Sequence, residues 1–140
     1  MNIIIVTDYG HINGGASKVA LESALALTER VDQVHVFFAI GEAASILKES
    51  PNLRITQLNQ KKVTEQPVSK SILAGLWNKE VQSEFSKVLD LYDPKDTIVH
   101  VHSWRDGTTL SFIPEVKKTW IQVDFHRPRF RFSMPDRRIL

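Results

Sequence analysis

Two short strings of this chain contain the residue types that bind or transform ligands. The first is Asn13-Gly14-Gly15-Ala16, near the N-terminus, and the second is His100-Val101-His102-Ser103-Trp104. Paired glycines at a turn let a backbone approach a ligand with no Cβ in between. Imidazoles and hydroxyls donate and accept hydrogen bonds, and imidazoles also bind metals. These strings are therefore the candidate binding residues.

The glycine string lies between a predicted strand and a predicted helix. Asn2–Thr7 is apolar and β-branched without alternation, which predicts a central parallel strand buried on both faces. A helical stripe follows the glycines, through Val19, Leu21, Leu25 and Leu27. Because a helix N-terminus offers unbonded N–H groups and a positive dipole end, the turn predicts a phosphate contact at Gly14, Gly15 and Ala16. The alternative is a tight turn that needs glycine only for a positive φ.

The spacing of these glycines excludes two well-known phosphate motifs. It is neither G-x-G-x-x-G, the dinucleotide fingerprint, nor G-x-x-x-x-G-K-[ST], the nucleoside triphosphate loop. Any phosphate contact here must therefore belong to another kind of site.

The histidine string permits a metal site only in part. Strand alternation puts His100 and His102 on one side of a predicted strand, where two imidazoles could share a metal. A third ligand is needed, and the nearby acid, Asp106, lies past the strand. We therefore expect no metal, and the alternative is strand-end imidazoles that meet backbone carbonyls. His35 is likewise expected to be a hydrogen-bonded core histidine and not a ligand.

The elements that must position these strings alternate between strands and helices. Strands are expected at Asn2–Thr7, Val34–Ala39, Leu53–Leu58 and Thr97–Val101, the third of them nearer an edge because it alternates. Helices are expected from Gly15 to about Arg30, from Ala43 to Glu49, from Ser69 onward and from Thr109 to Lys118. Such a series predicts an α/β fold with a doubly wound, Rossmann-like parallel sheet, which binds ligands beyond the carboxyl ends of its strands.

Composition suits a single domain of this kind. The 140 residues are 42% hydrophobic and 24% charged, with no cysteine, so a disulfide framework and a thiolate metal site are excluded. No run approaches the roughly 20 apolar residues of a membrane span, and we expect no signal peptide, because the chain begins without a basic segment or a cleavage site. We expect a cytoplasmic protein without a transmembrane segment, for which peripheral membrane contact stays open.

The positive charge is concentrated at the C-terminus. The formal net charge is +2, yet residues 124–140 contain five arginines against two aspartates, so the rest of the chain is slightly acidic. Arginines alternate there with Phe125, Phe130 and Phe132, a pattern that single-stranded nucleic acid binders also show. Because the body of the chain is not basic, we expect no nucleic acid partner.

The chain resembles the N-terminal domain of family 4 glycosyltransferases of the GT-B fold. That family opens with a strand, a loop with two glycines and a helix similar to Gly14-Gly15-Ala16-Ser17-Lys18-Val19-Ala20. It also commonly has D-[IV]-[IV]-H-x-H and a small residue, to which Asp96 through Trp104 is similar. The segment Ser111-Phe112-Ile113-Pro114 matches the family's next helix only loosely.

The resemblance implies an activity for the intact protein. That activity is transfer of a sugar, with retention, from a nucleotide-sugar donor to a hydroxyl of a glycan or lipid-linked acceptor. Gly14, Gly15 and Ala16 would lie on the donor-phosphate side, and His102 with Ser103 on the acceptor side. The family needs no cofactor and no metal. This chain lacks the donor-binding C-terminal domain and any assigned catalytic residue, so we expect it to be inactive alone.

The resemblance ends at about Val123. The family continues with T-x-H-D-[YF] and C-P-x-G-G, whereas this chain has an arginine-rich tail without a usable period. If the codons of the tail are read one base later, Met134 followed by Pro135 gives cysteine, and codon degeneracy permits both missing motifs in order. We therefore interpret residues 1–123 as the glycosyltransferase N-terminal domain and 124–140 as an irregular, frame-shifted, non-native tail.

Two other classes of protein stay open. A non-enzymatic nucleotide- or flavin-binding module of Rossmann or flavodoxin-like type would use the same glycine turn. A small nucleic acid binder would act through the tail, and its binding would depend strongly on salt.

Overall fold

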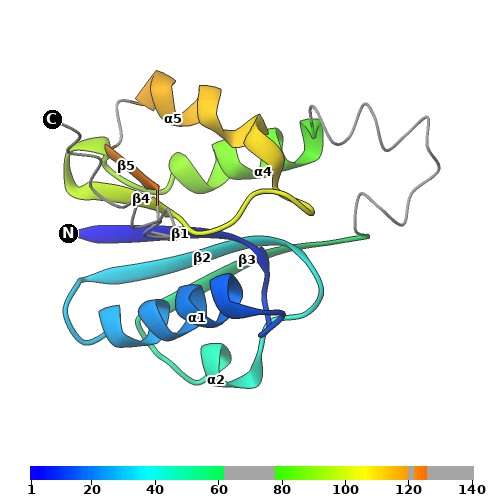
Figure 1. Ribbon diagram of the computed structural model, residues 1–140. Helices are drawn as coiled ribbons and strands as arrows, with labels where there is room; N and C mark the ends of the chain where they lie inside the picture. The colour runs from blue at the N-terminus through cyan, green and yellow to red at the C-terminus, as the bar shows by residue number, and fades with distance from the viewer. Residues whose placement is uncertain (62–77, 120–121, 126–140) are drawn as a thin grey trace, which may run out of the picture.

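The computed structural model describes residues 1–61, 78–119 and 122–125, and in them the chain forms one five-stranded parallel sheet. Its strands are β1 (Asn2–Tyr9), β2 (Gln33–Ile40), β3 (Leu53–Gln60), β4 (Thr97–Val101) and β5 (Gln122–Phe125). Their order across the sheet is β3-β2-β1-β4-β5. The fold is therefore α/β and doubly wound, as the sequence predicts (Figure 1).

Strand β1 is the centre of the sheet. It pairs with β2 from Asn2 opposite Gln33 to Tyr9 opposite Ile40, and with β4 from Asn2 opposite Thr97 onward. Its continuous apolar run explains this place, because a strand with a helical layer on each side buries side chains on both faces. Residues Ile4, Ile5 and Val6 are fully buried. The predicted central position of Asn2–Thr7 is confirmed.

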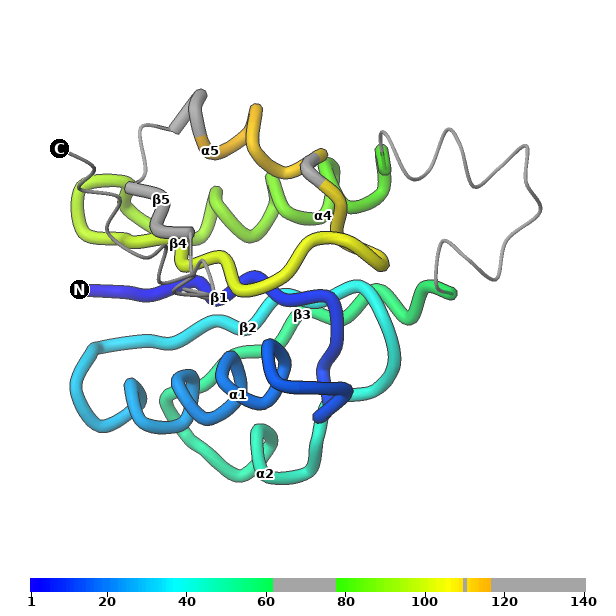
Figure 2. The backbone as a smooth tube through the Cα atoms, in the orientation of Figure 1, coloured from blue at the N-terminus to red at the C-terminus, as the bar shows by residue number. Residues whose placement is uncertain are grey.

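Helices cover both faces of the sheet. On one face lie α1 (Gly15–Leu27) and the short α2 (Ser45–Lys48), and on the other lie α4 (Lys79–Leu89) and α5 (Ile113–Thr119), as Figures 1 and 2 show. Short 3-10 helices precede β4 and α5, namely η2 (Pro94–Asp96) and η3 (Thr109–Phe112).

Each face has its own hydrophobic core. Under α1, the core includes Ile3, Ile5, Leu21, Phe38 and Leu47. Under α4, three phenylalanines pack edge to face, with ring centroids 5.0 Å apart for Phe37 and Phe85 and 5.5 Å apart for Phe85 and Phe112. The odd and even residues of β1 divide between these cores, because successive strand residues point to opposite faces.

The strand order identifies where the sheet reverses direction. The chain builds β1, β2 and β3 outward in one direction and then returns to add β4 on the other side of β1. This order belongs to the Rossmann type of doubly wound sheet, whereas the flavodoxin type places its second strand at the edge. The flavodoxin-like alternative is therefore wrong in its strand order. Ligands of such sheets bind at the switch point, which here lies between β1 and β4.

Several boundaries differ from the prediction. The irregular tail was expected from Asp124, but Asp124 and Phe125 continue β5 and pair with His100 and Val101, because a parallel neighbour is available to their backbone. Residues 126–140 lie outside the described part of the chain. The third strand was expected to end at Leu58, but β3 continues to Gln60. The first half of the helix expected from Ser69, up to residue 77, lies outside the described residues. Its second half corresponds to α4.

The described helices are too short or too polar to span a membrane. Over residues 1–61, 78–119 and 122–125, no helix reaches the length and hydropathy that a crossing requires.

His35 is a hydrogen-bonded core residue, as its strand position predicts. Its Nδ1 lies 2.9 Å from the hydroxyl of Tyr92, and its Nε2 lies 2.8 Å from Oγ1 of Thr56. The side chain is buried, and this burial lowers the pKa of His35 to about 4, with a smaller contribution from the charge of Arg54. The neutral imidazole is therefore the form that the fold accepts.

Because His35 is buried in its neutral form, the free energy of unfolding should decrease in mild acid. Between pH 6.5 and about 4 the unfolded chain binds a proton at His35 and the folded chain does not, so stability must fall as the pH falls. At about 1.4 kcal/mol per pKa unit, the loss reaches about 3 kcal/mol. We expect urea denaturation to show a flatter pH profile for His35→Gln, which keeps hydrogen-bonding atoms but does not titrate. Parallel profiles for the two proteins would contradict this assignment.

Candidate functional site at the crevice between β1 and β4

The glycine turn connects the end of β1 to the start of α1. Gly14 is the N-cap of α1, with φ 107° and ψ −179°, and no side chain caps the helix. The hydroxyl of Ser17 shapes the turn, since it accepts a hydrogen bond from the Asn13 N–H at 2.7 Å and donates one to the Gly14 carbonyl at 3.1 Å. A side chain from the first turn of α1 thus fixes the turn, and Asn13, Gly14, Gly15 and Ala16 remain exposed.

The fold requires glycine at one of the two glycine positions of this turn and not at the other. Gly14 has a positive φ that disfavours every residue with a Cβ. Gly15 has no such φ, and a Cβ built on it would meet nothing within 4 Å. The tight-turn interpretation therefore accounts for Gly14 and leaves Gly15 without a reason in the fold.

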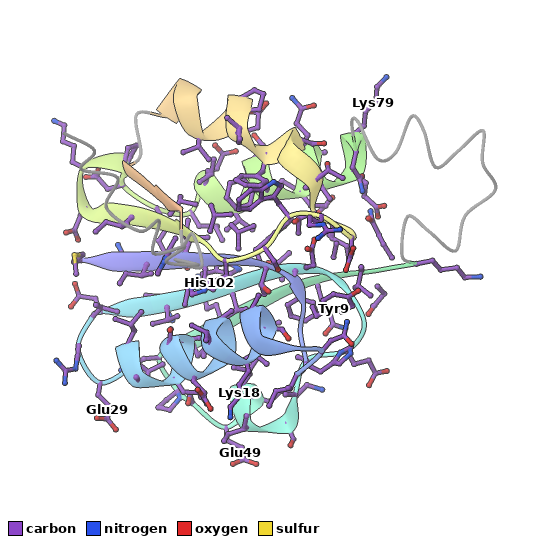
Figure 3. All side chains as sticks on the ribbon, in the orientation of Figure 1. Tyr9, Lys18, Glu29, Glu49, Lys79 and His102 are labelled. Atoms are coloured by element: carbon purple, nitrogen blue, oxygen red, sulfur yellow. The ribbon has the colours of Figure 1, made fainter. Side chains whose placement is uncertain are left out.

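The first turn of α1 is arranged to receive an anion. It contains no acidic residue, and the N–H groups of Gly15 and Ala16 donate to no acceptor within the described residues. A helix of 13 residues adds the positive end of its dipole at this point. Lys18 lies one turn further on the exposed side of α1, where its Nζ is 3.8 Å from the Glu22 carboxylate (Figure 3).

A buried carboxylate joins the end of β1 to the loop that follows β4. Asp8 is 2% exposed. Its Oδ1 accepts hydrogen bonds from the backbone N–H groups of Gly107 and Thr108 at 3.0 and 2.9 Å and from the Thr108 hydroxyl at 2.9 Å. Its Oδ2 accepts one from the Arg105 N–H at 2.8 Å. One side chain thus holds the loop after β4 against β1 at the switch point.

Close backbone packing completes this edge of the sheet. A Cβ on Gly10 would lie 2.2 Å from Cζ of the buried Phe38, and one on Gly107 would lie 2.7 Å from Cγ1 of Ile40. These glycines are required by their neighbours, unlike Gly15. The loops after β1, β2 and β4 therefore form one packed surface.

The side chain of Asn78 ties a further loop to the same edge. It accepts a hydrogen bond from the Val81 N–H, which caps α4, and donates to the Gly107 carbonyl at 3.2 Å and to Oε1 of Gln60 at 2.7 Å. The strand end of β3, the start of α4 and the loop after β4 are thereby connected. Thr109, which follows that loop, is buried with a φ of 48°, a strained conformation for a β-branched residue.

The predicted acceptor-side residues lie at this edge but serve the scaffold. The Ser103 hydroxyl accepts a hydrogen bond from the Asp8 N–H at 2.9 Å and lies 3.2 Å from Oγ1 of Thr7. The His102 N–H donates to the Val6 carbonyl at 2.9 Å, and the side chain is 5% exposed. The structure thus places Ser103 and His102 at the same edge of the sheet as the glycine turn, and their contact with an acceptor stays a prediction.

The two neighbouring histidines do not assemble a metal site with the described acids. Their rings are 4.3 Å apart between centroids and tilted by 39°. No group of three histidine, cysteine, aspartate or glutamate side chains suited to a metal ion occurs within residues 1–61, 78–119 and 122–125.

Three polar residues of this edge, Tyr9, His11 and Asp106, were not predicted to bind a substrate. The Tyr9 hydroxyl donates to Oδ2 of Asp106 at 2.8 Å, and the Tyr9 ring packs edge to face with His11, at 5.7 Å between centroids. Burial, followed by the nearby Asp106 carboxylate, raises the pKa of Tyr9 to about 12. The only signal in the sequence was position, because Tyr9 and Asp106 each follow an apolar strand.

Two hollows in the described part of the surface lie away from the glycine turn. One, of about 560 Å³, is lined by Ile3, Ser23, Ala26, Leu27, Arg30, Ile98 and His100, between α1 and the sheet. Another, of about 450 Å³, is lined by Lys79, Gln82, Ser83, Ser86, Lys87 and Glu115, between α4 and α5. Neither includes the glycine turn, which lies on an open surface.

Comparisons with protein-family models, with curated proteins and with solved structures find no match to this chain. Assignment of a function therefore depends on the geometry of this edge.

The different roles of the glycines can be measured by adding one methyl group. Gly10→Ala should cost about 1–3 kcal/mol of unfolding free energy, because its Cβ would overlap the fully buried Phe38 ring. Gly15→Ala should be neutral or stabilising by up to about 1 kcal/mol, because the unfolded chain loses freedom and the fold meets no obstacle. Urea denaturation of both variants checks this, and a clear loss for Gly15→Ala would show that the fold does need this glycine.

The hydrogen bonds of Asp8 predict that Asp8→Asn strongly lowers the free energy of unfolding. Asp8→Asn replaces one acceptor oxygen by a donor that faces backbone N–H groups, so we expect a loss of about 2–4 kcal/mol. The matched control is Asp90→Asn, at an exposed aspartate, for which a change below about 0.5 kcal/mol is expected. Equal stabilities of the two variants, measured by denaturant unfolding, would contradict the anchor.

Proposed function

We propose that this chain is the N-terminal, acceptor-side half of a GT-B glycosyltransferase, which transfers a sugar from a nucleotide-sugar donor to a hydroxyl of a glycan or lipid-linked acceptor. In this proposal the turn Gly14–Ala16 contacts the donor's diphosphate, and His102 and Ser103 support the acceptor side. A second, donor-binding domain supplies the remaining groups, so the 140 residues alone are inactive or nearly so. The absence of cysteine suits a cytoplasmic location.

The observation that carries the proposal is Gly15. It is exposed, its φ permits any residue, and a Cβ there would point into open space. A glycine that the fold does not need, at an uncapped helix N-terminus, is accounted for by a ligand that approaches the backbone closely. The position of the turn beside the β1–β4 switch point adds support, because ligands of doubly wound sheets bind there.

The open surface around the turn also suits half of a cleft. Gly14, Gly15 and Ala16 are exposed, so the isolated chain contacts a ligand at the turn from one side only. In group transfer from a nucleotide sugar, negative charge develops on the leaving diphosphate, and preorganised donors aimed at it lower the barrier. The N–H groups of Gly15 and Ala16 are donors of this kind, and the opposing domain would supply cationic groups.

Affinity for the isolated chain should be low. A helix N-terminus contributes roughly 0.3–1 kcal/mol to anion binding. Micromolar affinity requires about 8 kcal/mol. Binding of a nucleotide sugar in the millimolar range is therefore the expected result.

The strand order also favours a second candidate, a non-enzymatic nucleotide- or flavin-binding module of Rossmann type. The glycine spacing argues against it, because the fingerprint that places a dinucleotide in such a module is missing. Purified protein with the absorbance of a bound flavin or reduced nicotinamide would favour this candidate over the glycosyltransferase.

Amide chemical shifts of the 140-residue protein test the main proposal. On titration with UDP-glucose, we expect the signals of Gly14, Gly15 and Ala16 to move first and to saturate only at millimolar ligand. Gly15→Val should abolish this response with the fold intact, because the added side chain has space but covers the N–H groups.

The matched control is Ala26→Val, at an exposed position near the other end of α1, which should respond as the natural chain does. Shifts confined to the arginines after residue 125 would show plain charge attraction and would overturn the assignment of the turn.

A further inference from the structure

Asp106 and Asp8 belong to the same edge of the sheet but are used differently. Both oxygens of Asp8 are occupied, with four hydrogen bonds from the loop after β4. Asp106 is half-buried and receives one described hydrogen bond, from the Tyr9 hydroxyl to Oδ2. Its Oδ1 accepts none from the described residues. Asp8 is therefore an anchor, whereas Asp106 retains an acceptor oxygen for another molecule.

Tyr9 holds the Asp106 carboxylate in one orientation. The Tyr9 side chain is 6% exposed and packs in the core cluster under α4, so its ring cannot move freely. The preceding residue, Asp8, binds the loop that contains Asp106. Two consecutive residues of β1 thus fix both ends of the Tyr9–Asp106 contact across the switch point. The position of Oδ1 is set by the fold before any ligand arrives.

His11 is held in place by the Tyr9 ring and by Gly41. Its imidazole packs edge to face on Tyr9 and lies against Gly41, whose φ is 75°. A Cβ on Gly41 would come within 2.5 Å of Cε1 of His11, so the glycine leaves the space that the imidazole occupies. His11 is half-buried, and neither ring nitrogen takes part in a hydrogen bond with the described residues. The side chain is positioned by packing and keeps both of its polar atoms available.

These groups lie at the same edge of the sheet as the glycine turn. His11 precedes Gly14 by three residues and packs on the ring of Tyr9, the last residue of β1. Tyr9 lies at the carboxyl edge of the sheet, where Figure 3 labels it. The edge therefore presents N–H donors for an anion at the turn and a carboxylate beside them, which disfavours a second anion.

We propose that Asp106 and His11 form a subsite for hydroxyl groups of a neutral sugar, with Tyr9 as the positioning residue. Oδ1 of Asp106 accepts a hydrogen bond from one hydroxyl, and an imidazole nitrogen of His11 bonds a second. The inference rests on the proposed function and names its acceptor class. The acceptor presents an uncharged sugar ring here, because the Asp106 carboxylate repels a phosphate or a carboxylate at this point.

Titration of the 140-residue protein with neutral methyl hexosides tests the subsite. The probes are methyl α-glucoside, α-mannoside and α-galactoside, each to 0.5 M in steps of about tenfold, a range that covers weak affinities. At least one should shift the His11 imidazole signals and the amides of Asp106 and Gly107. Methyl α-glucuronide, the anionic counterpart of the first probe, should bind more weakly. No response to any neutral probe overturns the inference.

Variants separate a binding role from a structural one. Asp106→Asn and His11→Ala should each weaken sugar binding at least tenfold, and Asp106→Asn should remove the discrimination against glucuronide. Tyr9→Phe keeps the ring beside His11 and removes only the hydroxyl, so binding should weaken several-fold. The matched control is Glu42→Gln, at an exposed acid beside Gly41, which should bind as the natural chain does. Unchanged sugar affinity in Asp106→Asn would overturn the proposal.

The same samples keep this inference distinct from the proposed function. UDP-glucose is added to each variant, and the amides of Gly14, Gly15 and Ala16 report its diphosphate. Asp106→Asn should keep that response while the response to hexosides is lost, which supports a separate sugar subsite. Loss of both responses with altered β2 amides would show that Asp106 is structural and would overturn the subsite. A missing diphosphate response in the natural chain with retained hexoside binding counts against the proposed function alone.

Discussion

The buried carboxylate of Asp8 is the interaction on which the functional edge depends. In a doubly wound sheet the connections after β1 and β4 leave in opposite directions, which opens a crevice at the switch point. Asp8 holds the loop after β4 against the end of β1 at this point with four hydrogen bonds. Because a buried carboxylate without partners is costly, the loop has one favourable position. The bond between Tyr9 and Asp106 and the bond between the Asp8 N–H and Ser103 follow from it.

The carboxyl edge of the sheet around this anchor divides into two chemical regions. The glycine turn offers N–H donors and a helix dipole, and Gly15 is a glycine without a structural reason. Beside it, Asp106 and His11 offer hydrogen-bonding atoms held by Tyr9 and by the contact with Gly41. The transfer that we propose, from a nucleotide sugar to a sugar hydroxyl, requires one region for an anion and one for neutral hydroxyls. The same proposal accounts for the open surface, because it places the reaction between two domains.

Sequence reasoning succeeded where a local pattern was sufficient. The unbroken apolar run of β1 predicted its central place, and the helix expected from Ser69 onward includes α4. It was wrong at Asp124 and Phe125, which were assigned to an irregular tail but pair with β4. The error has a physical cause. A short strand is stabilised by hydrogen bonds to the backbone of a neighbouring strand. The residues of the short strand do not show whether such a neighbour is present.

The sequence by itself determined the fold class, the layers and the place of the glycine turn, because hydrophobic periodicity and turn residues act over a few neighbouring positions. Only the tertiary structure decided which polar residues are anchors and which present atoms to a ligand. Asp8 and Asp106 look equivalent in the sequence, as two acids after apolar strands. They differ because their partners, Thr108 for Asp8 and Tyr9 for Asp106, are nearly a hundred residues away along the chain. Such pairs form when β4 returns to the side of β1, and no local pattern encodes that contact.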